Sequence, residues 1–334
     1  MLNKTVVGLF ALMLLAAPVL AKERMGTVTF EFALKAPIEA TEVRLWVPYP
    51  QADGNQQISD IQVTGNFTSK NVGKEPKNGT TALFAEWKGP IAERKMTYRF
   101  TVLRKEVITK DFPKIEGPVS AEMKPYLDLT HLGKSEKRVK EIAADITKGK
   151  TTILAKARAI YDWVVENMRR DPNVKGCGLC EIDRLLVDKG GKCADIHTVF
   201  TALARSAGVP TREIYGIRMH KEKEGDITKF QHCWAEFFLP GYGWVVVDPA
   251  DVLKFKLEKN PTPEELKVKA EYFFGAVDEN RVQLSMGDHV VLEPAPKTGE
   301  LLYFMYPYAE VNGKPLNEDL YGFNIGYTIM FRER

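Results

Sequence analysis

Long apolar runs are scarce in this 334-residue sequence. Beyond its first 21 residues, no stretch approaches the roughly 20 consecutive apolar residues that a membrane-spanning helix needs. Runs of charge are also missing, because the formal net charge is +3 and both signs are mixed along the chain. Nucleic-acid binding usually needs a concentrated basic face, so this pattern argues against DNA or RNA as a partner.

Cysteine is rare as well, with four residues in the whole chain. That number is too small for a fold built on disulfides at this length, although an oxidising compartment would still favour a bridge between near neighbours. The sequence has no internal repeat and no low-complexity tract. Its length suffices for two domains, or for one domain with sizeable extensions.

The first 21 residues have the features of a secretory signal peptide. Lys4 gives a positive start, residues 6–17 are apolar, and VLA at 19–21 supplies a small-residue cleavage site. The apolar segment is too short for a comfortable membrane span; a retained anchor is the alternative. The short signal suits bacterial export. We therefore expect a mature chain that starts near Lys22, lies in the periplasm or is secreted, and has no stable membrane insertion.

Residues 24–112 alternate apolar and polar side chains, as half-buried strands do. The segments TVTFEFAL, TEVRLWVPYP and TYRFTVL show the alternation, and turn-rich pieces such as ADGNQQ and KEPKNGT separate them. This pattern predicts an antiparallel β-sandwich domain without a polar cluster that suggests chemistry. Proline and glycine mark residues 113–134 as a linker.

Helical periodicity follows the linker, and we expect residues 135–280 to form a second domain. Ser135 is placed to cap a first helix, and TILAKARAIYDWVVENM predicts a second. A third apolar stripe runs through CADIHTVFTALARSAGVPTR at 193–212 and ends in a Gly-Val-Pro stop signal. Residues 281–334 contain strand-like pieces and are expected to form a C-terminal β extension.

Cys193 lies at the start of that third helix. The positive end of the helix dipole and the nearby Lys192 favour a thiolate. Gly190 and Gly191 leave room for a substrate backbone, and the free N–H groups of the first turn, including that of Cys193, could stabilise an oxyanion. Helix position alone leaves a buried structural cysteine as an equal alternative.

A histidine and a carboxylate follow on two predicted strands. In FQHCWAEF, alternation puts His232 and Glu236 on one face. The PGYG turn folds WVVVDP back, and if Phe238 pairs with Trp244, Asp248 lies diagonal to His232. Such a carboxylate fixes the imidazole in the tautomer that a general base needs. Glu236 is expected to make a structural hydrogen bond instead.

Together, the segments CADIHTVFTALARSAGVPTR, HCWAEF and GWVVVDP resemble the transglutaminase-like superfamily, mainly over residues 150–253. The resemblance implies a papain-like α+β core, here preceded by the antiparallel β-sandwich domain. It implies a Cys-His-Asp triad of Cys193, His232 and Asp248 that works through a thioester intermediate. The calcium-ligand loops of eukaryotic members are not recognisable, and the resemblance implies no metal and no cofactor.

The leading hypothesis is a cysteine-dependent amide hydrolase or acyltransferase that acts on peptide or protein substrates. Cell-wall peptides suit the expected compartment. The alternative is a catalytically inactive module of the same fold that serves binding or assembly in the periplasm. The presence of all three triad residue types in their motifs favours the enzyme.

The remaining cysteines allow other interpretations. One is a zinc site with these ligands: Cys177, Cys180 and Cys193, with His197 or His232. A single CxxC supports it weakly, and it supports a redox role for CGLC even less, because no strand precedes the motif. A structural disulfide among Cys177, Cys180 and Cys233 is favoured over both, with the pairing open. His197 is expected to be a structural histidine.

Overall fold

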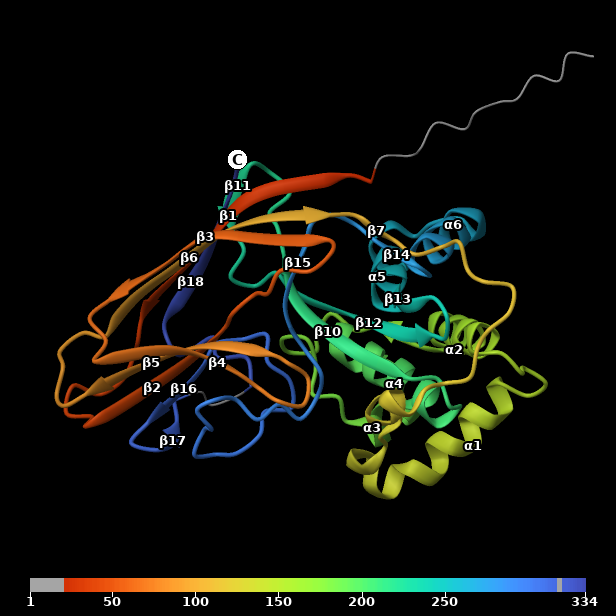
Figure 1. Cartoon of the computed structure of the whole chain (residues 1–334), viewed down its shortest axis with the longest axis horizontal. Helices are drawn as coiled ribbons and strands as arrows, with labels where there is room; N and C mark the ends of the chain where they lie inside the picture. The colour runs from red at the N-terminus through yellow and green to blue at the C-terminus, as the bar shows by residue number, and fades with distance from the viewer. Residues whose placement is uncertain (1–20, 317–319) are drawn as a thin grey trace, which may run out of the picture.

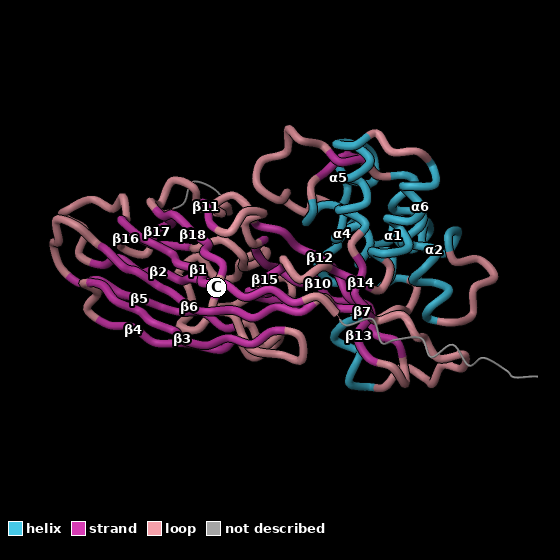
Figure 2. Tube along the Cα trace, turned by 90° about the horizontal axis from the view of Figure 1, so that it is seen from above, coloured by secondary structure: helices cyan, strands magenta, loops and turns pink. Residues whose placement is uncertain are grey.

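A computed structural model describes residues 21–316 and 320–334 (Figure 1). Apart from Ala21, the predicted signal peptide lies outside these residues. Among the described residues, no helix is both long enough and apolar enough to cross a membrane. A strand-rich part and a helix-rich part lie side by side, as Figure 2 shows. The predicted α+β core preceded by an antiparallel β-sandwich is confirmed.

The strand-rich part consists of two five-stranded antiparallel sheets. Their strands from the first third of the chain are β1 (Glu23–Ala33), β2 (Glu42–Pro48), β3 (Gln56–Gly65), β4 (Ser69–Lys74), β5 (Thr81–Lys88) and β6 (Lys95–Lys105). Period-two alternation buries Val28 and Phe30 of β1 against Leu45 and Trp87 of the opposite sheet. This apolar layer between the sheets stabilises the sandwich.

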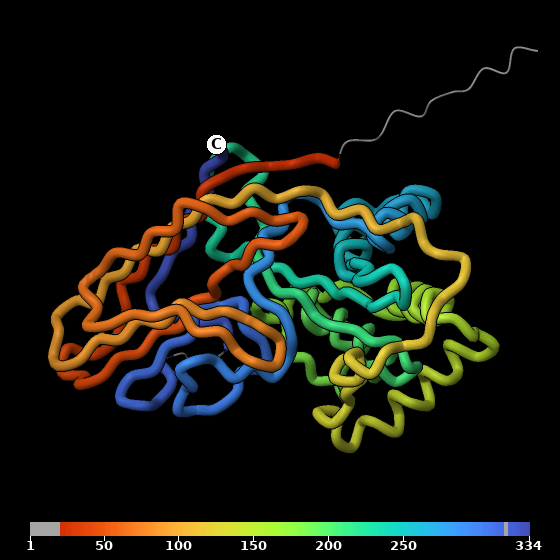
Figure 3. Tube along the Cα trace, in the orientation of Figure 1, coloured from red at the N-terminus to blue at the C-terminus, as the bar shows by residue number. Residues whose placement is uncertain are grey.

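The C-terminal strands complete these two sheets. They are β16 (Tyr308–Val311), β17 (Lys314–Pro315) and β18 (Tyr327–Glu333), and the short β11 (Glu224–Asp226) joins them from the second part of the chain. β18 pairs with β1 and β16 pairs with β2, so the first and last strands of the described chain lie side by side (Figure 3). The segment 281–334 is therefore divided between both parts of the molecule, since its first strand belongs to the core.

The core has a four-stranded sheet in the order β13-β12-β10-β15. Its strands are β10 (Thr211–Arg218), β12 (Gln231–Leu239), β13 (Gly243–Val247) and β15 (Arg281–Met286). The helices are α1 (Glu136–Ile146), α2 (Ile153–Asn167), α3 (Ile182–Asp188), α4 (Cys193–Ser206), α5 (Pro249–Lys259) and α6 (Pro263–Phe273). Helix α4 packs on β12 and is buried along almost its whole length.

Four two-residue strands and two 3₁₀ helices connect these elements. The strands are β7 (Val107–Ile108), paired with β14 (Ala276–Val277), and β8 (Arg169–Arg170), paired in parallel with β9 (Gly190–Gly191). The 3₁₀ helices η1 (Ala121–Leu127) and η2 (Thr130–Ser135) lie within the predicted linker. Helix α1 begins directly after Ser135, as the sequence predicts, but the Ser135 hydroxyl makes no capping hydrogen bond.

The hairpin β12–β13 has the register that the sequence predicts, because Phe238 pairs with Trp244. The same ladder aligns Ala235 with Val247, which places Asp248 just beyond the paired residues and next to the N-terminal half of β12. A shift by one residue would move every side chain to the other face. The turn residues therefore fix where the Asp248 carboxylate lies relative to His232.

Replacement of Phe331 tests the contribution of the C-terminal strand. Phe331 is fully buried in the sandwich, whereas its neighbour Met330 is largely exposed. Phe331→Ala should lower the free energy of unfolding by about 3–5 kcal/mol, because it removes a large core side chain. Met330→Ala, the matched control on the same strand, should change it little. Urea denaturation measures both, and equal stabilities would contradict the placement of β18 in the sheet.

Candidate active site

The loop before α4 is held tightly against the start of the helix. The Asp195 carboxylate accepts hydrogen bonds from the backbone N–H groups of Lys192 (3.1 Å) and Cys180 (3.0 Å). A Cβ at Gly178 or Gly191 would come within 2.4 Å of Asp195, so both positions require glycine. These contacts fix Cys193 as the first residue of α4, as the sequence predicts.

The Cys193 thiol is surrounded by two other thiols and an imidazole. Hydrogen bonds with Cys177 and Cys233 hold the pKa of Cys193 well below its usual range, and His232 lowers it further, although burial opposes them. The same bonds and burial raise the pKa values of Cys177 and Cys233. The protons therefore stay on these two neighbours. Of these three thiols, Cys193 is the one whose pKa is lowered, and its place at the positive end of α4 acts in the same direction.

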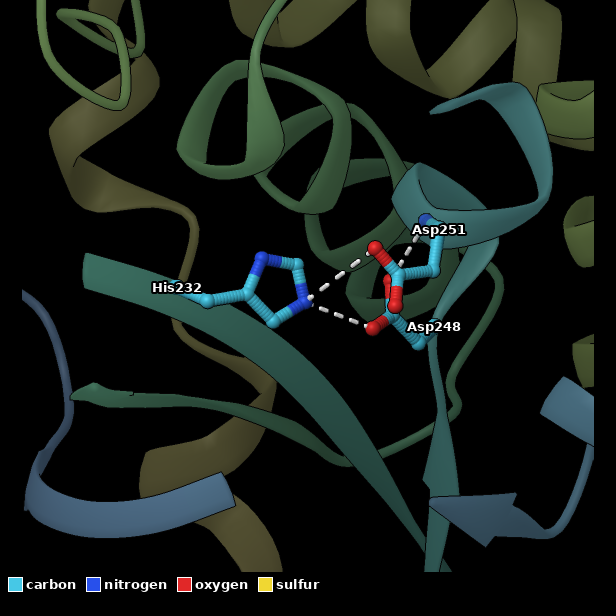
Figure 4. Close-up of side chains that lie close together, drawn as sticks. All are labelled: His232, Asp248 and Asp251. Carbon is cyan, nitrogen blue, oxygen red and sulfur yellow. Dashed lines mark hydrogen bonds and ion pairs between the residues drawn. The ribbon is translucent and has the colours of Figure 1, made fainter. Parts of the chain in front are cut away.

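His232 connects this thiolate to a carboxylate. Its Nε2 lies 2.7 Å from Oδ2 of Asp248 (Figure 4). The imidazole also forms a hydrogen bond with Cys193, for which Nδ1 is the remaining ring nitrogen. The other oxygen of Asp248, Oδ1, accepts a hydrogen bond from the backbone N–H of Asp251 (2.9 Å) at the start of α5. Asp248 thus caps a helix and orients an imidazole at the same time. The structure brings the three predicted residues, Cys193, His232 and Asp248, into one cluster.

Arg281 compensates the buried charge of Asp248. Both side chains are fully buried, and the Arg281 guanidinium contacts Asp248 while it also pairs with Asp251 (2.6 Å) and Asp278 (3.1 Å). Burial raises the pKa of Asp248, but His232 and Arg281 lower it more, so that it lies well below its usual range. The carboxylate is therefore ionised at neutral pH and acts as an acceptor toward His232.

His197 lies closer to this cluster than the sequence indicates. It is fully buried, its Nε2 lies 3.3 Å from Oδ1 of Asp248, and its Nδ1 lies 3.5 Å from the Cys233 sulfur. The approach to Asp248 is poorly aligned for a hydrogen bond, and Nε2 has no hydrogen-bond partner among the described residues. Asp248 thus has an imidazole on each side, and His232 makes the better contact.

The sequence missed Arg281 and Asp251. Arg281 comes from β15, more than thirty residues beyond Asp248, in a segment where no motif marks it. Asp251 had a weak signal, because it lies three residues after the helix-capping Asp248. Both contact Asp248: the Arg281 guanidinium neutralises its charge, and the backbone N–H of Asp251 donates a hydrogen bond to it.

A metal ion does not fit this cluster. His232, Asp248 and Asp251 form the group of potential ligands that the described residues bring within 4.8 Å of one another. However, Arg281 pairs with both carboxylates, and Arg218 lies 2.5 Å from Asp251. Two guanidinium groups already neutralise these acids, and they would repel a cation.

The four cysteines are all free thiols, so the expected disulfide among Cys177, Cys180 and Cys233 is wrong. The reason is the direction of the CGLC loop. Cys177 faces Cys193, whereas Cys180 contacts Thr198 on another face of α4. The two ends of the CxxC therefore lie on different sides of the helix, which also separates the ligands of the zinc site considered from the sequence.

The YFMYPY segment at 303–308 packs against the same loop. Tyr306 donates a hydrogen bond to the Cys177 sulfur (3.2 Å), and Tyr303 donates one to the Gly178 carbonyl (2.7 Å). Cys193 is 1% exposed and His232 is 4% exposed. The structure therefore shows the site in a closed form, with C-terminal aromatic side chains holding one of its walls.

Comparisons with known proteins agree with this geometry. Residues 140–249 match the family model described as the transglutaminase-like superfamily. An uncharacterized protein from Haemophilus influenzae is 36% identical over 304 residues, which cover 83% of this chain and 82% of that protein. YebA of Bacillus subtilis, also uncharacterized, is 26% identical over 130 residues, which cover 34% of this chain and 17% of that protein.

A solved structure with the same fold is a candidate cysteine protease from Cytophaga hutchinsonii. It superimposes with a TM-score of 0.56 at 13% identity and covers 93% of this chain and 98% of that one. At this identity the likeness establishes the fold alone. The α+β core with a buried Cys-His-Asp cluster at a helix N-terminus defines the class. The chain belongs to the transglutaminase-like superfamily.

Replacement of Arg281 tests the charge balance of the cluster. Arg281→Gln should lower the free energy of unfolding at pH 7 by about 3–5 kcal/mol, because buried carboxylates lose their counter-ion. The pKa of Asp248 is depressed in the wild type, so its stabilisation is present above the unfolded value near 4 and is lost as the pH falls. The difference in the free energy of unfolding between the wild type and Arg281→Gln should therefore become smaller at acidic pH.

Urea denaturation between pH 3 and pH 7 measures this difference. Arg332→Gln is the matched control, because the ion pair of Arg332 with Glu224 is exposed on both sides. It should change the free energy of unfolding little at any pH. A similar small effect for Arg281→Gln would show that Asp248 does not depend on its counter-ion.

Proposed function

We propose that this protein is a cysteine-dependent amide hydrolase or acyltransferase in which Cys193, His232 and Asp248 form the catalytic triad. One observation carries the proposal: the Nε2 of His232 is bonded to Asp248, so its Nδ1 serves the low-pKa thiol at the start of α4. A base oriented by a carboxylate and directed at a thiol is the arrangement that activates a cysteine nucleophile.

In the first half of the reaction, the Cys193 thiolate attacks the carbonyl carbon of an amide. The backbone N–H of Cys193 has no intrahelical partner, because it is the first residue of α4, and it donates to the oxyanion that forms. The imidazolium of His232 then gives its proton to the departing amine, the C–N bond breaks, and the acyl group remains on sulfur as a thioester.

In the second half, His232 removes a proton from water or from an amine. The activated nucleophile attacks the thioester carbonyl, and the acyl group leaves as an acid or as a new amide while Cys193 is regenerated. Asp248 stays ionised throughout and holds the imidazole in place. Water makes the protein a hydrolase, whereas an amine makes it an acyltransferase.

The substrates are peptides or proteins outside the cytoplasm in this proposal. The N-terminal signal pattern supports export to the periplasm or beyond, and peptides of the cell wall are amide substrates present there. Because Cys193 is 1% exposed, substrate binding has to displace part of its cover. The 303–308 segment is a candidate for that movement, since it holds the loop of Cys177 by two side-chain hydrogen bonds.

The alternative function is a non-catalytic binding or assembly module with the same fold. The burial of Cys193 and His232 favours this binding module, whereas the charges and hydrogen bonds around the proposed triad favour the enzyme. A binding module has no need for a thiol that is kept ionised by two thiol donors and an imidazole.

Trapping of the acyl group distinguishes the two functions. The purified mature chain is incubated with a peptide extract of the bacterial cell envelope, and intact-protein mass spectrometry follows covalent adducts. The wild type should gain an acyl mass that hydroxylamine removes as a hydroxamate, because thioesters react with this nucleophile. Cys193→Ala should gain none, and His232→Gln should acylate more slowly by a factor of at least about 100.

Cys180→Ala serves as the matched control for removal of a thiol. Its pKa is raised by burial and it lies away from His232, so this variant should acylate like the wild type. An adduct that persists in Cys193→Ala would reject Cys193 as the nucleophile. Tight peptide binding by a wild type that never forms an adduct would support the binding module.

A further inference from the structure

Arg104 is a buried cation whose hydrogen bonds are incomplete. It lies near the end of β6, is 2% exposed, and neither Nε nor Nη1 of its guanidinium has a hydrogen-bond partner among the described residues. Burial lowers its pKa. An arginine presents five N–H donors in a planar fork, and burial without acceptors costs free energy. The nearby carboxylates compensate this buried charge, but two of its nitrogens have no hydrogen bond among the described residues.

The carboxylates around Arg104 are engaged elsewhere. Asp53 is the nearest, but its Oδ1 lies 3.8 Å from Nη1, outside hydrogen-bond range, and accepts from the backbone N–H of Asn55. Glu236 accepts from both Nε and Nη2 of Arg212 at 2.7 Å. Asp278 pairs with Arg281. The described residues therefore give Arg104 one distant ion pair, with Asp53, and leave Nε and Nη1 without a hydrogen bond.

A cavity of about 240 Å³ lies beside this guanidinium, between the β-sandwich and the core. Arg104 and Asn55 line it from the sandwich, and Arg212, Trp234, Trp244 and Gln283 line it from the core. The Arg212 guanidinium stacks 4.1 Å from the Trp244 ring centre, which gives the cavity a flat, rigid wall. Its volume lies below that of a typical drug-sized pocket and suits an acylated amino acid.

We propose that this cavity binds a carboxylate, such as the C-terminal carboxylate of a peptide, with Arg104 as the principal donor. A guanidinium fork matches a carboxylate in two parallel hydrogen bonds. The side-chain amides of Asn55 and Gln283 can bond a neighbouring peptide group, and the indoles can cover a small side chain. Glu236 and Asp53 limit the positive potential, which favours a singly charged carboxylate over a phosphate.

This site goes beyond the proposed catalysis and does not depend on it. Trp234 and Glu236 lie on the same strand, β12, as His232, but the cavity contains none of the triad residues. Residues from both parts of the molecule form its walls, so a bound carboxylate contacts the sandwich and the core together. Binding is measured without turnover, and a failure of the catalytic proposal would leave this proposal intact.

A matched pair of small probes tests the site. N-acetyl-L-alanine carries the carboxylate, and N-acetyl-L-alaninamide has nearly the same shape without the charge. Isothermal titration calorimetry on the wild type at constant ionic strength should show that the acid binds at least about tenfold more tightly than the amide, since hydrogen bonds to a charged group contribute more. The acid should also raise the thermal unfolding midpoint in a saturable manner.

Two arginine variants assign the effect. Arg104→Met should fold, because it replaces a buried charge with incomplete hydrogen bonds by an apolar chain, and it should lose the preference for the acid. Arg99→Met is the control on the same strand; Arg99 bonds Gln62 at the surface, and its loss should leave the preference unchanged. Circular dichroism checks that both variants are folded.

The outcomes decide the proposal in either direction. Equal binding of the acid and the amide by the wild type would overturn it, and this comparison needs no variant. A preference that persists in Arg104→Met would overturn it as well. If Arg104→Met does not fold, Gln283→Ala replaces it, because this variant keeps the charge and removes one lining amide. It should weaken binding of the acid severalfold, and unchanged affinity would reject the cavity as the binding site.

Discussion

The buried charge of Asp248 is the constraint on which the site depends. Its carboxylate is removed from water, which would ordinarily favour the neutral acid. Arg281, His232 and the first turn of α5 together compensate the burial and keep the group ionised. These partners come from β15, β12 and α5, so the correct packing of three elements is needed before His232 has its orientation.

The thiols on the other side of His232 follow from this arrangement. Cys193 begins a helix that is buried along most of its length, so solvent contributes little to the stability of a thiolate there. Cys177 and Cys233 take over that role as hydrogen-bond donors. The pKa of Cys193 is therefore lowered, while the pKa values of Cys177 and Cys233 are raised. The absence of a disulfide among these four cysteines is consistent with this use of their protons.

The triad could be predicted from the sequence because each member lies in a segment with strong local order. The helix period placed Cys193 at an N-terminus, and the pairing of Phe238 with Trp244 placed Asp248 beside His232. Arg281 could not be predicted, since its contact with Asp248 depends on the packing of a distant strand.

The errors and omissions have a common physical origin. The disulfide was expected from proximity in sequence, whereas Cys177 and Cys180 of the CGLC loop contact different residues of α4, Cys193 and Thr198. β18 pairs with β1 although the two strands lie about 300 residues apart in the sequence. Alternation predicts that a segment is a strand, but it does not identify the strand with which it pairs. Local patterns thus predicted the elements and the place of Cys193 at the start of a helix, while long-range charge pairs and sheet partners required the three-dimensional structure.

The most direct test of the account is the ionisation of Cys193, measured by the ultraviolet absorbance of its thiolate near 240 nm. The difference between the wild type and Cys193→Ser, followed between pH 4 and pH 9, gives the titration of this one sulfur. The account predicts a titration well below the ordinary value of about 8.5, and a partial shift toward that value in His232→Ala. A wild-type titration near 8.5 that His232→Ala leaves unchanged would contradict it.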